Sequence, residues 1–537
     1  MKIIPEKKSL AVAAALAPAA LASIIGYASA QGPAAIHPVV TPSMPPLMQI
    51  PLEKALKIQI PKPAKNLTPS PFQPSKTLKG WVVEIPGNHP ICTPAYYEGK
   101  LYVGGGYGSN DFFCFDAETG KLVWQYHTND DGPTAAVVEN GCVAFNTESC
   151  TVFVLDAATG KELWKEWLGD PLMSQPAIAQ NRLFMAFPSG QRGHGVTGHA
   201  LLCADLKTGK HLWSRPITSD VISSPVIEYD RVYLSCMDGT SYCFDTKTGA
   251  QVWKRQNAAT SAPVIHDGQL IVSERGKAGT KTTEGIRRID ARRGDSGDKI
   301  LLAAGNAPYI SAATNGTIGP QMAAAMVGGA AGASAASAAY GGAHSYGAQS
   351  STTVAAAKPV NASKSEWYKS MDSAVGFAAP PPNAQLSKAE ANLGINSVAG
   401  AWGYQGARAA FHNGAVTNTQ LTFVNSVDAK SGKMNWRAEA KGSFVTGENQ
   451  VFSTPALGKK NLYLCSGNGH LVCMDQISGK INYMYATNEP ISFQPALAKG
   501  KVYIGTANGK LICLSGDDAD ADGWTAWGGN AQHNNAE

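Results

Sequence analysis

Several features that would assign this sequence to a functional class are missing from it. The formal net charge is only +5 over 537 residues, and lysine and arginine are spread along the chain, so the basic patch of a nucleic-acid-binding protein is absent. Beyond the first thirty residues, no stretch approaches the roughly 18 apolar residues that a membrane-spanning helix requires. A Cys-x-x-Cys-His sequence is also absent, which excludes the usual covalent attachment of haem. We therefore expect neither nucleic acid as a partner nor a stable membrane span in the mature chain.

Residues 1–30 have the parts of a secretory signal peptide. A basic start precedes an apolar run from Leu10 to Ile25, and Ala28-Ser29-Ala30 ends the segment. The run is long enough to leave an uncleaved anchor as an alternative, but Pro18 and the small residues at its end favour cleavage. We expect export to the periplasm, the cell surface or the extracellular space. The first cysteine is Cys92, so a lipid anchor at the cleavage site is not expected.

Residues 31–79 are rich in proline, with eleven prolines and scattered lysines. This composition favours an extended linker, and we predict a spacer between the signal peptide and the folded part. Docking of a partner onto the proline-rich segment is the alternative.

A recurring phrase begins after this segment. Its central aspartates lie 40 to 49 residues apart within each run of repeats, an interval that suits a four-stranded propeller blade. The six clear copies are FDAETGKLVW (115–124), LDAATGKELW (155–164), ADLKTGKHLW (204–213), FDTKTGAQVW (244–253), VDAKSGKMNW (427–436) and MDQISGKINY (474–483). A degenerate seventh copy, IDARRGD (289–295), lacks the tryptophan.

Each repeat predicts four antiparallel strands. The aspartate and glycine of the phrase form a corner between two strands, because Asp bonds turn amides and Gly takes a positive φ. An Asn-Gly or Asp-Gly hairpin often precedes the corner, and a Pro-led strand precedes the hairpin. The sequence predicts an all-β, eight-bladed β-propeller over 80–515. The eighth copy lacks its last strand, so we expect the N-terminal strand with Trp81 to close the ring.

The corners and the Pro-Ala strand starts resemble the repeats of the pyrroloquinoline quinone (PQQ)-like propeller family. This family includes quinoprotein dehydrogenases, and the resemblance implies PQQ, a calcium-type ion and a catalytic aspartate for those members. The sequence lacks the adjacent Cys-Cys pair that such enzymes place against the cofactor, and its blade loops are short. We therefore predict no catalytic, cofactor-binding or metal-binding residue. A PQQ-dependent alcohol or sugar dehydrogenase with PQQ and calcium is the alternative.

The ten cysteines raise the question of disulfides in an exported chain. Five of them occupy one repeat position, two residues before the corner, and blades hold such positions apart, so we expect small buried core residues: Cys114, Cys203, Cys243, Cys473 and Cys513. Five others leave the connectivity open: Cys92, Cys142, Cys150, Cys236 and Cys465.

Three groups of polar residues suggest ligands only weakly. Asp518, Asp520 and Asp522 before Gly523 resemble the start of a calcium loop, but the twelfth position is Gly529, and a solvated acidic tail over 516–537 is preferred. A second group, His194 and His199, could hold a metal, but no carboxylate or cysteine accompanies the pair. The third is a basic cluster that includes an Arg-Gly-Asp sequence, interpreted as a solvated face or a patch for an anionic partner: Arg287, Arg288, Arg292 and Arg293.

The resulting functional expectation is a protein-binding scaffold. Complete blades without catalytic residues favour a monomeric propeller that binds envelope or extracellular proteins, with a role similar to that of the propeller lipoproteins of outer-membrane assembly. The Ala-, Gly- and Ser-rich insertion at 306–396 buries little apolar surface, and polymerisation through it is a third possibility.

Overall fold

The computed structural model describes residues 44–106, 108–147, 149–168, 174–188, 199–278, 281–305, 409–420, 422–441, 452–491, 493–516, 518–523 and 528–530. The predicted signal peptide, the insertion at 306–396 and His194 lie outside these residues. The described part is all-β apart from one 3-10 helix, Leu52–Lys54.

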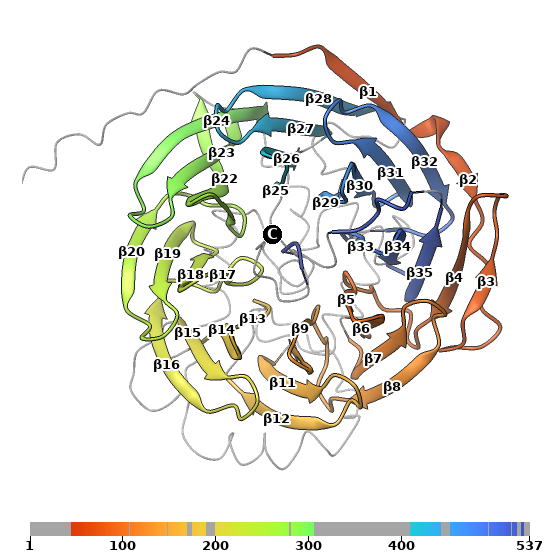
Figure 1. Cartoon of the computed structure of the whole chain (residues 1–537), viewed down its shortest axis with the longest axis horizontal. Helices are drawn as coiled ribbons and strands as arrows, with labels where there is room; N and C mark the ends of the chain where they lie inside the picture. The colour runs from red at the N-terminus through yellow and green to blue at the C-terminus, as the bar shows by residue number, and fades with distance from the viewer. Residues whose placement is uncertain are drawn as a thin grey trace, which may run out of the picture. The chain divides into compact units, whose positions relative to one another are not determined.

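Eight sheets form a ring, which confirms the predicted propeller (Figure 1). Blades one to four comprise β5 (Ala95–Tyr97), β6 (Lys100–Gly104), β7 (Asp111–Asp116) and β8 (Leu122–His127); β9 (Val137–Glu139), β10 (Cys142–Asn146), β11 (Thr151–Asp156) and β12 (Glu162–Trp167); β13 (Ala177–Ala179), β14 (Arg182–Pro188), β15 (His199–Asp205) and β16 (His211–Ile217); and β17 (Val226–Glu228), β18 (Arg231–Ser235), β19 (Thr240–Asp245) and β20 (Gln251–Gln256). Blades five to eight comprise β21 (Val264–His266), β22 (Gln269–Ala278), β23 (Lys281–Asp290) and β24 (Ser296–Gly305); β25 (Ala409–His412), β26 (Ala415–Gln420), β27 (Phe423–Asp428) and β28 (Met434–Lys441); β29 (Ala456–Leu457), β30 (Asn461–Cys465), β31 (His470–Asp475) and β32 (Ile481–Thr487); and β33 (Ala496–Ala498), β34 (Lys501–Gly505), β35 (Lys510–Ser515) and β4 (Lys79–Glu84).

The ring closes through the predicted strand. β4 pairs antiparallel with β35, and Trp81 lies opposite Cys513, as the equivalent tryptophan Trp124 lies opposite Cys114 in blade one. The Tyr503 hydroxyl of blade eight donates to the Ala117 carbonyl of blade one at 3.2 Å. The first and last parts of the propeller therefore form one continuous sheet and one continuous core.

The proline-rich segment is not a spacer over its described part, and the predicted linker is wrong there. Three strands arise from it and give blades six, seven and eight a fifth strand: β1 (Leu47–Pro51), β2 (Leu56–Ile58) and β3 (Ser70–Phe72). β1 and β2 run parallel to β28 and β32, and Ile50 and Ile58 are buried. Burial of these side chains between the prolines is what turns a linker composition into strands.

The corners form as predicted and also join neighbouring blades. In blade two, Asp156 accepts hydrogen bonds from the Thr159 amide at 2.8 Å and the Thr159 hydroxyl at 2.7 Å, which lower the pKa of Asp156. Gly160 has φ +73°, and a Cβ atom there would meet the Trp124 ring of blade one at 2.6 Å. The same tryptophan donates its indole N–H to the Ala157 carbonyl of this corner at 3.1 Å.

Six junctions between blades repeat this arrangement of indole and corner glycine. The pairs are Trp81 with Gly120, Trp124 with Gly160, Trp164 with Gly209, Trp213 with Gly249, Trp253 with Gly294, and Trp436 with Gly479. The indole N–H of each tryptophan donates to a corner carbonyl at 2.8 to 3.1 Å. The recurring phrase therefore determines contacts between blades as well as the turn within each blade.

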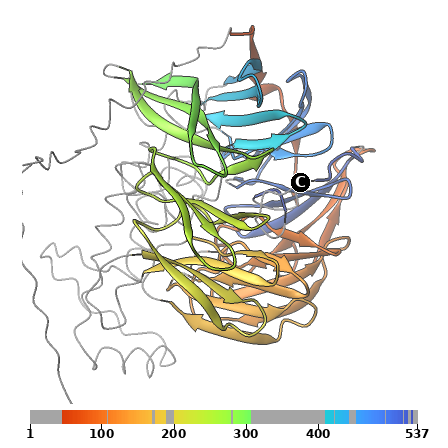
Figure 2. The ribbon, with the colours of Figure 1, turned by 60° about the vertical axis from the view of Figure 1, so that its left-hand side comes forward.

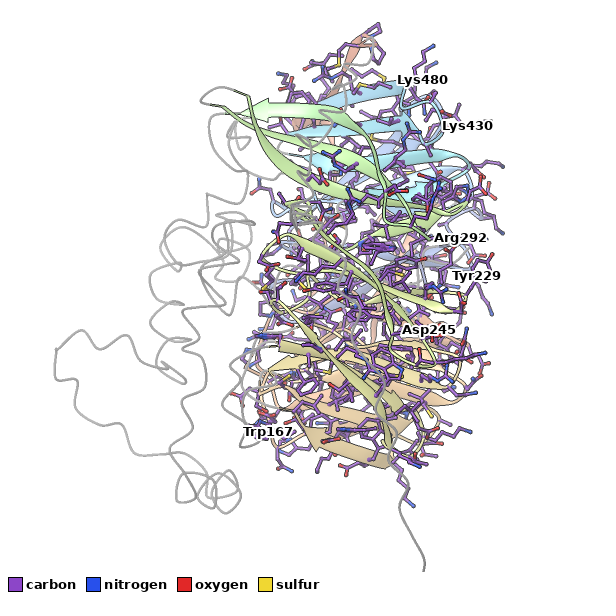
Figure 3. All side chains as sticks on the ribbon, turned by 90° about the vertical axis from the view of Figure 1, so that its left-hand side faces the viewer. Trp167, Tyr229, Asp245, Arg292, Lys430 and Lys480 are labelled. Carbon is purple, nitrogen blue, oxygen red and sulfur yellow. The ribbon has the colours of Figure 1, made fainter. Side chains whose placement is uncertain are left out.

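Figure 2 shows the ring of blades turned towards its side, so that its two rims can be distinguished. We call the rim that carries the Asp-Gly corners the corner face, and the rim where the chain crosses from the outer strand of one blade to the inner strand of the next the crossing face. Figure 3 shows Asp245, Arg292, Lys430 and Lys480 on the corner face and Trp167, at the end of β12, on the opposite side.

Candidate functional site

The predicted arginine cluster divides between three structural roles. Arg287 donates from Nε to the buried Glu274 carboxylate at 2.6 Å. Arg288 donates to the Ala429 carbonyl of blade six at 3.1 Å, and so replaces the missing tryptophan of blade five. The side chain of Arg293 is 75% exposed and lies near Asp290 and Asp295, and Gly294 is the corner glycine over Trp253. The Arg-Gly-Asp sequence is thus the turn of blade five.

The aspartates of the tail pack against blades seven and eight instead of forming a solvated tail, contrary to the prediction. Asp518 accepts hydrogen bonds from the Asn461 amide at 2.7 Å and from the Tyr463 hydroxyl. Asp520 pairs with Lys460 at 2.7 Å, and Asp522 lies 3.6 Å from Lys459. Because each carboxylate has its own partner, the three do not converge on a common point.

No cluster of three or more metal-ligating side chains occurs among the described residues. His199 is buried at the start of β15, opposite Pro188 and Ile217. Since His194 lies outside the described residues, the histidine pair stays a prediction.

The crossing face carries buried ion pairs. Glu489 and Lys510 of blade eight form one pair, and Glu274 and Arg287 of blade five form another. Glu489 and Glu274 are 4% and 2% exposed. In these two pairs, each buried glutamate is therefore neutralised by a neighbouring cation.

Asp220 is a buried carboxyl group between blades three and four that sequence analysis missed. It is completely buried, and burial raises its pKa to about 7, although the Val221 amide donates to it at 2.8 Å. Hydrogen bonds from Ser174 also act to lower this pKa, but less than burial raises it. Nothing in the sequence distinguishes this aspartate, because its burial results from the approach of neighbouring blades.

We expect Asp220→Asn to reduce the loss of stability between about pH 4 and pH 7. The pKa of Asp220 is about 7 in the folded chain, above the ordinary 3.8, so the folded state retains a proton that the unfolded state releases. Stability therefore falls as the pH rises through this window. Urea unfolding at pH 4.5 and pH 8 should show a smaller decline in the variant, by about 1 to 3 kcal/mol. The exposed Asp230→Asn is the control, and equal declines in both variants would contradict the prediction.

All ten cysteines are buried thiols, including the five at the repeat position. Burial raises the pKa of Cys114, Cys203 and Cys243 to about 12. Since alkylation requires the thiolate, iodoacetamide at pH 8 should leave the folded protein unmodified and label ten cysteines in guanidinium chloride. Mass spectrometry checks this, and labelling of the folded chain faster than it unfolds would contradict it.

Four exposed aliphatic side chains repeat at one register, immediately before the tryptophan of blades one to four. Val123, Leu163, Leu212 and Val252 are 44%, 43%, 44% and 41% exposed. Blades six and seven, whose outer strands pair with β1 and β2 at 437–441 and 485–487, carry Asn435 and Asn482 at the equivalent positions. Blades one to four thus carry an apolar row at this register that blades six and seven lack.

Among the described residues, no helix has the length and the apolar character that spanning a membrane requires.

The family model described as the outer membrane protein assembly factor BamB matches residues 76–192, 148–308 and 411–534. The matched ranges together cover most of the propeller. The chain belongs to this PQQ-like propeller family. The repeats quoted from the sequence are therefore those of a PQQ-like propeller, which confirms the resemblance. No curated protein matches the full sequence in a direct comparison.

Solved structures match the chain at low identity and with TM-scores below 0.5. BamB from Moraxella catarrhalis is 12% identical, with coverage of 83% of this chain and 98% of that chain and a TM-score of 0.46. The quinohemoprotein alcohol dehydrogenase ADHIIG from Pseudomonas putida HK5 is 11% identical, with coverage of 81% and 76% and a TM-score of 0.47. Saccharomyces cerevisiae Sqt1 is 9% identical, with coverage of 81% and 98% and a TM-score of 0.49. These values are too low to transfer a ligand or an activity.

Proposed function

We propose that this PQQ-like propeller is exported and acts as a non-catalytic scaffold that binds protein partners in the cell envelope. The observation that carries the proposal is the apolar row of Val123, Leu163, Leu212 and Val252 on four consecutive blades. Single exposed aliphatic residues are ordinary. Their repetition at one register on four consecutive blades, with asparagine at that register in blades six and seven, supports a contact surface. The description of the matching family as an outer membrane assembly factor supports an envelope location.

The proposal includes no PQQ site. PQQ carries three carboxylates, so its site needs cations that are free to bind them, together with oxygen ligands for a divalent ion. The described cations of the buried pairs on the crossing face, Arg287 and Lys510, are each bound by a buried glutamate. We therefore route no chemical step through this cofactor.

Partner capture from an envelope fraction tests the scaffold role. The quadruple variant that places asparagine at positions 123, 163, 212 and 252 copies the residue found in blades six and seven. We expect it to lose captured partners, while Ile477→Asn, at a side chain that is 85% exposed on a corner, keeps them. Repeated capture without any partner, or equal recovery by both variants, would overturn the proposal.

A cofactor assay tests the dehydrogenase alternative. Mature protein supplied with PQQ and calcium should show neither bound-cofactor absorbance nor reduction of an artificial acceptor with alcohols or sugars. If both signals appeared, the chain would be a quinoprotein dehydrogenase.

A further inference from the structure

The junction between blades seven and eight lacks both halves of the contact found at the six tryptophan junctions. Tyr483 occupies the tryptophan position, because it lies opposite Cys473 as Trp124 lies opposite Cys114. The corner of blade eight is also missing: β35 ends at Ser515, and its outer neighbour β4 starts at Lys79, from the other end of the chain. Among the described residues, neither an indole nor a corner glycine therefore fills this junction.

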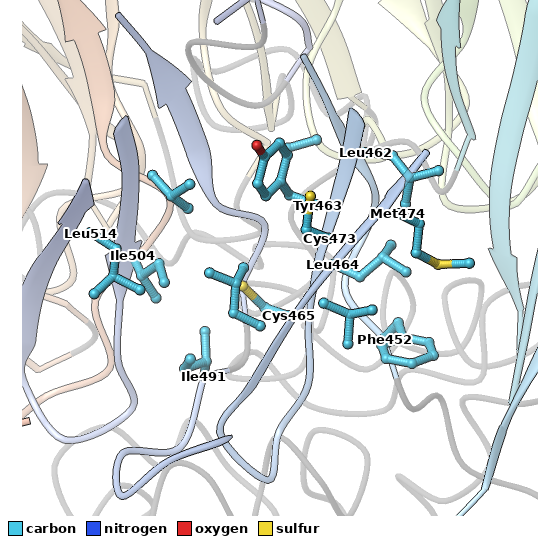
Figure 4. Close-up of a cluster of buried hydrophobic side chains, with 14 of the residues drawn as sticks. Phe452, Leu462, Tyr463, Leu464, Cys465, Cys473, Met474, Ile491, Ile504 and Leu514 are labelled. Carbon is cyan, nitrogen blue, oxygen red and sulfur yellow. The ribbon is translucent and has the colours of Figure 1, made fainter. Parts of the chain in front are cut away.

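A cavity of about 310 Å³ lies at this junction. Three segments that meet near the closure of the ring contribute to its lining: Leu78, Tyr483 and Tyr485, and Leu514, Gly516 and Asp518. Figure 4 shows Tyr463 and Cys473 of blade seven, with Leu514 and Ile504 of blade eight nearby. The volume is within the range of pockets that hold small ligands or single side chains.

The lining suits a flat apolar group with one hydrogen-bond donor. Tyrosine and leucine side chains form part of the wall, and Asp518 provides carboxylate oxygens held by Asn461 and Tyr463. The Asn482 amide donates to Asn461 at 2.8 Å, so this polar edge is a connected network. The described lining residues include no lysine, arginine or histidine, which disfavours an anionic ligand.

We propose that this cavity binds an indole, as the side chain of a tryptophan. At six other junctions the same protein places an indole between the two blades, with its N–H donating to a carbonyl oxygen. An indole entering the cavity would restore the missing aromatic contact against blade eight and would place its N–H near the acceptors around Asp518. The inference holds whether or not the propeller is a scaffold.

Two sources could supply the indole. Trp524 and Trp527 follow Ala521, which lines the cavity, by three and six residues in the sequence. A tryptophan of a partner protein is the other source. Both sources would supply the same indole side chain, and the titration below distinguishes them.

The probe is N-acetyl-L-tryptophanamide, with the mature chain and calorimetric titration as the measurement. We expect binding by the wild type or, where the tail competes, by the Trp524→Ala/Trp527→Ala variant. N-acetylglycinamide, which has no ring, should not bind. Tyr483→Trp fills the cavity from within and should weaken probe binding at least tenfold. If Tyr483→Trp does not fold, Thr77→Trp takes its place in the test, because Thr77 lines the cavity from an exposed position.

The outcomes divide clearly. Tighter probe binding by the tail variant than by the wild type assigns the site to the tail of the same chain, and equal binding assigns it to a partner. Absence of binding by both proteins, or unchanged affinity in both cavity-filling variants, would overturn the proposal. Partner capture tests the aliphatic row and does not involve this cavity. A negative capture experiment would therefore count against the scaffold role, and a negative probe titration would count against the cavity.

Discussion

Gly160→Ala is expected to lower the free energy of unfolding by about 2 to 5 kcal/mol. Two costs combine at this position. An alanine at φ +73° is strained, and its Cβ atom would lie 2.6 Å from the Trp124 ring, so the indole of the neighbouring blade would have to move. Chemical denaturation of the wild type and the variant at the same pH measures the loss.

Gly141→Ala is the matched control because it separates strain from packing. Gly141 has φ +75°, nearly the same backbone conformation, but a Cβ atom there would meet nothing within 4 Å. Strain alone should cost about 1 to 2 kcal/mol. If the two variants were equally stable, the contact between the corner and the indole would contribute nothing, and our account of the blade junctions would be wrong.

The propeller could be predicted because its signals are local in the sequence. The Asp-Thr-Gly corner, the Asn-Gly hairpin and the Pro-led strand each fix a few dihedral angles with residues that are close together. Closure by Trp81 followed from counting strands, since an eighth blade with three strands leaves an open edge. The role of the corner glycine as a platform for an indole could not be predicted, because it depends on a residue of another blade.

The missed features all depend on contacts between distant segments. β1 and β2 are short runs between prolines, and they form strands only because blade edges some 390 residues and 429 residues further along the chain accept them, at Arg437 and Tyr485. Arg288 replaces a tryptophan by reaching a carbonyl 141 residues away. The burial of Asp220 likewise has no local signature.

Trp213→Ala is expected to lower the free energy of unfolding by about 3 to 5 kcal/mol. The side chain is 7% exposed and lies between blades three and four, with the rings of Phe184 and Phe244 at 6.0 and 6.5 Å. Removing it leaves a cavity between two sheets and an unsatisfied Thr246 carbonyl, which the indole N–H now approaches at 3.0 Å. Urea unfolding with a common slope for both proteins measures the difference.

The neighbouring residue supplies the control, since Leu212 is 44% exposed on the same strand. Leu212→Ala removes aliphatic atoms that are already in contact with water, so its effect should stay below about 1 kcal/mol. Trp213→Phe keeps an aromatic ring but loses the donor, and it should fall between the two. An equal loss for Trp213→Ala and Leu212→Ala would mean that the blades are held together by strand pairing alone. The loss of unfolding free energy should therefore be largest for Trp213→Ala, smaller for Trp213→Phe and smallest for Leu212→Ala. This order follows if the indoles packed between blades at six junctions contribute much of the stability of the ring.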